Sequence, residues 1–132
     1  MRLIHEPREL ATLIEAVAPP DQLFPDFDPH EWIRNPDHLA FAIEHDLVMF
    51  EHLGANRWLG HIWFVSRGKR ALARAAKFLD LMTTRFSAVA ILGEIPSHRK
   101  DVLAFMARLG FERIGKGRHP SGMSLIVVKR GT

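Results

Sequence analysis

The chain has 132 residues, of which 47% are hydrophobic and 25% are charged, and this balance predicts one folded domain over residues 1–132. No stretch approaches the roughly 18 consecutive apolar residues that a membrane-spanning helix needs, so no membrane association is expected. Cysteine is absent, which excludes disulfides, thiolate metal sites and a cysteine nucleophile. This composition fits a cytoplasmic protein.

Charge is divided unevenly along the chain. Residues 1–51 hold three basic and eleven acidic side chains, a formal charge of −8, whereas residues 52–132 hold fifteen basic and four acidic ones, a formal charge of +11. The second segment is therefore the expected seat of an anionic ligand, such as a nucleotide-like cofactor or nucleic acid. The acidic first segment is the alternative partner for this charge.

The first elements are predicted to be helical. Apolar residues recur at helical spacing after Pro7, which predicts a helix that ends at Pro19 and Pro20. The Pro- and Asp-rich stretch that follows is predicted to be a loop. A short helix is expected over Pro29–Arg34, with Asp28 as its N-cap.

Three strands are predicted next. Apolar residues alternate with smaller ones over residues 39–43, and two further strands are expected at Leu47–Leu53 and Arg57–Val65. The turn Gly54-Ala55-Asn56 is typical of a hairpin between the last two. Strands joined by such short turns form an antiparallel meander.

The rest of the chain alternates helices and strands. A long helix is expected over residues 72–86, then a strand over Ala88–Leu92, then a helix that Ser97 caps and Gly110 ends. The last two strands are expected at Phe111–Gly115 and Met123–Lys129. The resulting order, β-α-α-β-β-β-α-β-α-β-β, predicts an α/β fold with a mixed, mostly antiparallel sheet flanked by helices.

One segment has a composition that suits anion binding. The strand Arg57–Val65 leads through the basic turn Arg67–Ala71 into the long helix. A helix N-terminus carries partial positive charge and unpaired N–H groups, and a glycine such as Gly68 lets a ligand approach the backbone. The turn is therefore a candidate cradle for a phosphate or pyrophosphate. The basic residues that continue along the helix, Arg74 and Lys77, are more simply read as a solvated face.

The residues of this turn resemble a known motif. Arg67-Gly68-Lys69-Arg70-Ala71 looks like a degenerate form of the pyrophosphate loop of the GCN5-related N-acetyltransferase (GNAT) superfamily. The later Leu109–Gly115, which reads LGFERIG, is similar to the ending that often follows the fourth helix of that family. In particular, the chain is similar to small GNAT-like proteins of phages and prophages. It departs from the family at Met106, where a tyrosine acid is frequent.

The resemblance implies a fold, a cosubstrate and a reaction. The domain would be a GNAT-like acyltransferase that binds acetyl-CoA between two parallel strands, Gly60–Val65 and Ala88–Ile95, which splay apart at that end. The acetyl group would pass directly to an amine of a small-molecule or protein acceptor that the sequence does not name. The implied cofactor-binding residues are Ile62, Trp63, Phe64, Val65, Arg67, Gly68, Lys69, Arg70, Ala71 and Arg99.

Direct transfer needs a base, because an alkyl ammonium must lose a proton before it can attack. The first candidate is Glu94, at the end of its strand and in the half of the chain that is poor in acids. His61 is the second, because an ordinary imidazole titrates near neutral pH. Glu51, at the end of another strand, is the third. Glu94 and His61 could instead be structural, Glu94 as the partner of an arginine and His61 as an ordinary strand histidine.

Other functions are weighed against this one. The eight histidines include no pair at i, i+4 spacing, so no metal is expected. Nucleic-acid binding fits the basic charge but lacks a recognition motif. A non-catalytic GNAT-like structural or interaction protein of a phage or prophage is the remaining alternative, and it would act in the host cytoplasm or the virion. The C-terminal strand could also pair across a homodimer.

Overall fold

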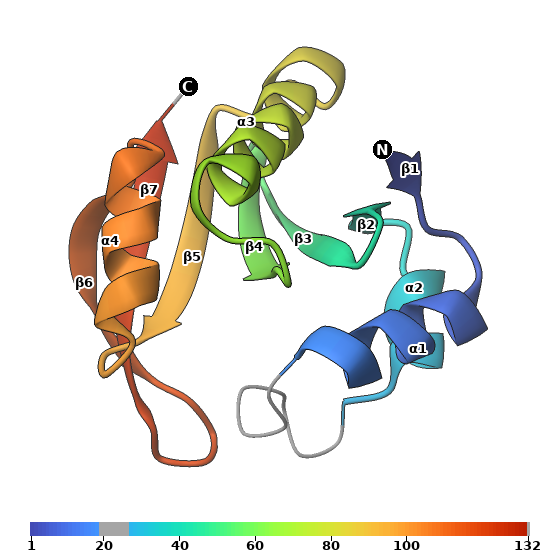
Figure 1. Ribbon diagram of the computed structural model, residues 1–132, viewed down its shortest axis with the longest axis horizontal. Coiled ribbons are helices and arrows are strands. Elements are labelled where there is room, and N and C mark those ends of the chain that lie inside the picture. The colour runs from blue at the N-terminus through green and yellow to red at the C-terminus, as the bar shows by residue number, and fades with distance from the viewer. Residues whose placement is uncertain (19–26, 132) are drawn as a thin grey trace.

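The computed structural model describes residues 1–18 and 27–131, and within these ranges the chain forms a seven-stranded sheet with four α-helices (Figure 1). None of the helices in these two ranges is long and apolar enough to cross a membrane. In chain order the elements are β1 (Arg2–Leu3), α1 (Pro7–Val17), α2 (Pro29–Arg34), β2 (His38–Ile43), β3 (Asp46–Gly54), β4 (Arg57–Trp63), α3 (Gly68–Arg85), β5 (Ala90–Pro96), α4 (Lys100–Arg108), β6 (Glu112–Arg118) and β7 (Ser124–Gly131).

The sheet is mixed and mostly antiparallel, as predicted. Its strands lie in the order β1-β2-β3-β4-β5-β7-β6. Every neighbouring pair is antiparallel except β4 and β5, which run parallel because α3 connects them. The meander of β2, β3 and β4 is confirmed.

The two faces of the sheet carry separate hydrophobic clusters. Side chains alternate between the faces along each strand. On β4, Trp58 and Ile62 point to the face covered by α3 and α4, where they join one cluster. Trp63 has the opposite parity and packs with the cluster of α1 and α2. The same alternation places His61 on the α1 and α2 face.

The parallel pair β4 and β5 opens into a fork. Among the described residues these strands pair at only three positions, and the last of them joins Leu59 to Leu92. Beyond that point β4 stays bound to β3 as far as Trp63, while β5 stays bound to β7 as far as Pro96. The two strands therefore diverge toward their C-terminal ends (Figure 1), and part of the backbone along the inner edges has no strand partner.

β5 begins and ends later than the strand predicted over Ala88–Leu92. The N–H of Ala88 donates to the carbonyl of Met82 at the end of α3, which keeps Ala88 out of the sheet. At the other end, pairing with β7 continues to Pro96, which lies opposite Leu125. The contact with Met82 sets the first end of this strand and pairing with β7 sets the second, and the alternation of apolar residues reveals neither.

The predicted N-cap at Ser97 is wrong. The N–H of Ser97 donates to the carbonyl of Ser124 and so continues the contact between β5 and β7, while the N-cap of α4 is Arg99, without a capping side chain. β6 also runs past its predicted end at Gly115, to Arg118, because it pairs with β7 along that length.

The N-terminal helices follow the prediction where the structure describes them. α1 ends at Val17, and Pro19 and Pro20, which were expected to end it, lie outside the described residues. The side chain of Asp28 caps α2 as predicted, since it accepts a hydrogen bond from the N–H of His30 at 2.9 Å.

Gly60 stands where the fork opens, and we expect Gly60→Ala to lower the free energy of unfolding by about 1–3 kcal/mol. A Cβ at this position would lie 3.1 Å from the ring of Phe50, which is fully buried. Urea denaturation measures the change. Gly115→Ala in β6 is the control, because a Cβ there meets nothing within 4 Å. Equal effects of the two substitutions would contradict the steric argument.

Candidate active site

A cleft of about 530 Å³ occupies the fork between β4 and β5, a size typical of small-molecule sites. The walls come from β4, β5, the start of α3, α4 and the hairpin between β6 and β7. The predicted cofactor-binding residues that line the cleft are Ile62, Trp63, Phe64, Arg67, Gly68, Ala71 and Arg99.

The lining of the cleft includes both aromatic and charged side chains. Phe64 on the β4 side lies near Phe105 of α4, with ring centroids 6.5 Å apart, and both line the cleft. Arg99 also lines it and forms an ion pair with Asp101 at 3.1 Å. The hairpin contributes Arg118. A long, partly apolar molecule with an anionic end matches this lining.

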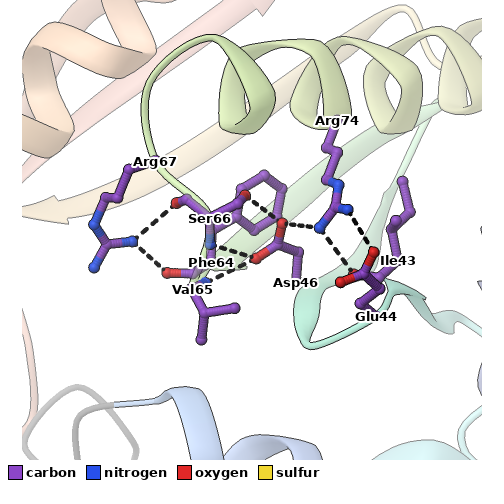
Figure 2. Close-up of polar contacts among 8 residues, drawn as sticks. All are labelled: Ile43, Glu44, Asp46, Phe64, Val65, Ser66, Arg67 and Arg74. Carbon is purple, nitrogen blue, oxygen red and sulfur yellow. Dashed lines mark hydrogen bonds and ion pairs between the residues drawn. The ribbon is translucent and has the colours of Figure 1, made fainter.

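The turn between β4 and α3 is tied down by a buried carboxylate (Figure 2). Asp46 at the start of β3 is fully buried, and its Oδ1 accepts hydrogen bonds from the N–H groups of Val65 and Ser66 at 2.7 and 3.0 Å. Its Oδ2 accepts from the hydroxyl of Ser66 and from Arg74 Nη1, the latter at 2.7 Å. Arg74 also contacts Glu44 at 3.0 Å.

These contacts fix the charge state of Asp46. Burial raises the pKa of Asp46, but the hydrogen bonds from Ser66, Arg74 and Val65 outweigh burial and hold the pKa below its ordinary value of 3.8. Asp46 is therefore a carboxylate at neutral pH. The side chain of Arg74 is only 13% exposed, so its assignment to a solvated helix face is wrong.

The N–H of Val65 is therefore not open to a ligand. It was predicted to bind the cofactor, but Asp46 occupies it, and Val65 is absent from the described lining of the cleft. The physical reason is that the buried carboxylate of Asp46, on a neighbouring strand, accepts the hydrogen bond of this N–H.

The backbone N–H groups at the start of α3, by contrast, are available to a ligand. Its N-cap is Arg67, and no side chain caps the helix. The N–H groups of Gly68, Lys69 and Arg70 have no helical carbonyl four residues before them and so have no partner within the helix. Gly68 has φ +61° and open space where a Cβ would lie.

Among the basic side chains of this turn, that of Arg67 belongs to the described lining of the cleft and those of Lys69 and Arg70 do not. Arg67 lines the cleft and folds across the turn, where its Nη1 donates to the carbonyls of Phe64 and Ser66 at 2.7 and 3.0 Å (Figure 2). The side chains of Lys69 and Arg70 are exposed and, among the described residues, are not part of the cleft wall. For these two, only the backbone N–H groups remain candidates.

Two of the three predicted bases line the cleft. His61 on β4 and Glu94 on β5 do so from opposite sides of the fork. In the part of the chain that the structure describes, Glu94 is exposed and forms no ion pair, so its alternative role as the partner of an arginine is not seen.

Glu51 lies beside His61, outside the described lining of the cleft. Its Oε1 accepts a hydrogen bond from Trp32 Nε1 at 2.9 Å, and its Oε2 lies 3.7 Å from His61 Nε2, the distance of an ion pair. The contact with His61 is the largest influence on Glu51; burial opposes it, the N–H of Trp32 reinforces it, and the pKa falls to about 2. So acidic a carboxyl is a poor proton acceptor at neutral pH.

Sequence reasoning missed several residues of the site. Nothing in the local sequence around Asp46 pointed to partners on β4 and α3. Trp32 and the hairpin residues Arg118 and His119 belong to no recognisable sequence motif. Over residues 1–18 and 27–131, no group of three or more potential ligands could hold a metal ion.

Comparison with known proteins shows the fold. No protein-family model and no curated protein matches the sequence. A variant of spermidine N-acetyltransferase SpeG from Vibrio cholerae is similar in structure with a TM-score of 0.75 and 10% identity, over 99% of this chain and 95% of that one. Ribosomal-protein-alanine N-acetyltransferase from Brucella melitensis has a TM-score of 0.73 and 14% identity, with both chains covered in full.

The chain has the GNAT fold. RimJ from Mycobacterium smegmatis, solved in complex with CoA-disulfide, is also similar, with a TM-score of 0.65 and 17% identity over 78% of this chain and 57% of that one. At these identities the similarity to GNAT acetyltransferases concerns the fold, and function has to be argued from the site.

Proposed function

We propose that this protein is a GNAT-family N-acetyltransferase that binds acetyl-CoA in the cleft and transfers the acetyl group to an amine of a small molecule or protein. The observation that carries the proposal is the fork between β4 and β5, which leads to the uncapped start of α3. The RimJ complex supports it, because a protein with a similar fold binds a form of CoA.

The start of α3 fits the diphosphate of CoA. Its three free N–H groups and the helix dipole favour an anion, and Gly68 leaves room for close approach. Arg67 lines the same cleft and adds positive charge, while Arg99 contributes a guanidinium that is paired with Asp101. Asp46 holds the turn before the helix, so these donors are in place before a ligand arrives.

The fork fits the narrow arm of the cosubstrate. Phe64 and Phe105 give this part of the cleft an apolar surface, and the inner edge of β4 offers backbone N–H groups. A backbone N–H that meets negative charge developing on the thioester oxygen accelerates acyl transfer by about 10²–10³-fold. Acetyl-CoA supplies the acetyl group, which passes to the amine nitrogen as a C–N bond forms and the C–S bond breaks.

The proton of the amine goes to His61. This residue lines the cleft on the α1 and α2 face, whereas Ile62 and Phe64 lie toward α3 and α4. The acceptor therefore enters from the α1 and α2 face. Glu94, across the fork on β5, attracts the ammonium form of the acceptor. No cysteine is present to carry the acetyl group, so transfer is direct.

Calorimetry with CoA on two variants tests the proposal. Gly68→Asp and Gly68→Asn have nearly the same shape, and both residues tolerate the positive φ of this position. The negative charge of aspartate would face the diphosphate, so we expect the Asp variant to bind CoA at least about tenfold more weakly than the Asn variant. An acidic residue at a helix N-terminus also stabilises the helix, so lost binding would not reflect unfolding.

Other outcomes contradict the proposal in different ways. Equal CoA affinities of the two variants would show that the diphosphate does not sit at α3. No CoA binding by the wild-type protein, together with a rise in Tm on adding DNA, would instead support nucleic-acid binding. CoA binding without acetyl transfer to spermidine, amino-acid esters or N-terminal peptides would favour a non-catalytic GNAT-like protein.

A further inference from the structure

Glu51 and His61 are neighbours across two antiparallel strands. Glu51 pairs with Leu59 and Met49 pairs with His61, so Glu51 and His61 are diagonal on one face of the sheet. Diagonal neighbours are within reach of long side chains. This register, rather than a flexible loop, brings the carboxylate to the ring.

The carboxylate is held in one orientation. Trp32 Nε1 donates to Glu51 Oε1 at 2.9 Å, which leaves Oε2 facing His61 Nε2. Trp32 is itself fixed: it is buried, its ring stacks on His38 with centroids 4.4 Å apart, and its carbonyl lies 2.7 Å from His38 Nδ1. Glu51 therefore presents a defined acceptor oxygen.

The ring of His61 is also fixed. It lies parallel to the ring of Trp63, with an interplanar angle of 5° and centroids 5.7 Å apart. With Nε2 turned to Glu51, the second ring nitrogen, Nδ1, is the one that no ion pair or hydrogen bond engages in the described residues. An N–H at Nε2 leaves the lone pair of a neutral imidazole on Nδ1.

We propose that Glu51 and Trp32 are positioning residues that hold His61 with its proton on Nε2, so that Nδ1 takes the proton of the acceptor amine. This inference rests on the proposed function and adds to it the nitrogen that acts and the residues that select it. In the step, the N–H bond of the ammonium breaks, an N–H bond forms at Nδ1, and the imidazolium charge faces the Glu51 carboxylate. The 3.7 Å separation shortens as that charge forms, as catalytic hydrogen bonds commonly do.

Glu51→Gln tests this inference, because the structure predicts which tautomer of His61 the substitution will favour. Trp32 donates an N–H, so it selects the carbonyl oxygen of the new amide and turns the NH₂ group toward His61 Nε2. An NH₂ donor there requires a lone pair on Nε2 and moves the ring proton to Nδ1. We therefore expect ¹⁵N NMR at alkaline pH to report the Nε2–H tautomer in the wild-type protein and the Nδ1–H tautomer in Glu51→Gln.

The value of kcat should change with the tautomer of His61. With the best acceptor of an amine panel, we expect kcat to fall about 10–100-fold in Glu51→Gln, while KM for acetyl-CoA stays the same. The double variant Trp32→Phe/Glu51→Gln frees the amide to turn over, so part of the Nε2–H tautomer and part of kcat should return. Glu112→Gln in β6 is the control for loss of a carboxylate charge and should change neither readout.

The outcomes separate this inference from the proposed function. The same His61 tautomer in the wild-type protein and in Glu51→Gln would overturn the inference even if acetyl transfer is robust. A wild-type protein with the Nε2–H tautomer that binds no CoA would overturn the proposed function instead. No recovery in the double variant would contradict the part assigned to Trp32.

Discussion

Asp46→Ala should lower the free energy of unfolding by about 3–5 kcal/mol, the usual effect of breaking a buried charge pair. Asp46 is the fully buried residue that accepts hydrogen bonds from the turn before α3 and from Arg74. Its loss leaves the N–H groups of Val65 and Ser66 and the guanidinium of Arg74 without this acceptor. Urea denaturation at neutral pH measures the change.

Glu44→Ala is the matched control, because Glu44 contacts the same guanidinium from an exposed position. We expect it to change stability by less than about 1 kcal/mol, as for most surface ion pairs. The pH dependence gives a second check. The pKa of Asp46 lies below 3.8 in the folded protein, so its contribution is present above about pH 4 and is lost as the pH falls through the lowered pKa. If Asp46→Ala retained the wild-type loss of stability in acid, this assignment would be wrong.

His61→Gln should lower kcat for acetyl transfer by about 10²–10⁴-fold, the range for loss of a general base. The amide can still contact Glu51 but has no basic nitrogen. Since His61 takes the proton and does not hold CoA, the Kd for CoA from calorimetry should be unchanged. Stopped assays of thiol release measure kcat.

Glu94→Gln is the comparison that separates the two cleft residues. As the group that attracts the ammonium, Glu94 should affect KM for the acceptor more than kcat. The opposite result, a large fall in kcat in Glu94→Gln with His61→Gln almost fully active, would make Glu94 the base.

The meander and α3 were predictable because their signals are local. Alternation over β2 to β4 and the helical spacing along α3 each lie within one segment. The ends of β5 were not predictable, because pairing with β7 keeps Pro96 in the sheet and a contact with Met82 keeps Ala88 out of it.

The residues of the candidate site likewise fall into those that the local sequence indicates and those that only the folded chain brings together. The turn at Gly68 could be found because charge, glycine and a helix start coincide in adjacent residues. Asp46 could not, because its partners Ser66 and Arg74 lie 20 and 28 positions away and only the folded sheet brings them together. The sequence did not indicate that the side chains of Lys69 and Arg70 lie outside the described lining of the cleft, because composition does not fix which way a first helical turn faces.

The fork also bears on whether the protein pairs with other chains through its strand edges. Exposed strand edges invite pairing with other polypeptides and are a common origin of aggregation. Here the unpaired inner edges of β4 and β5 face each other within one molecule, and side chains of α4 and of the turn before α3 enclose the space between them. A linear molecule bound in this cleft would lie along the same backbone groups.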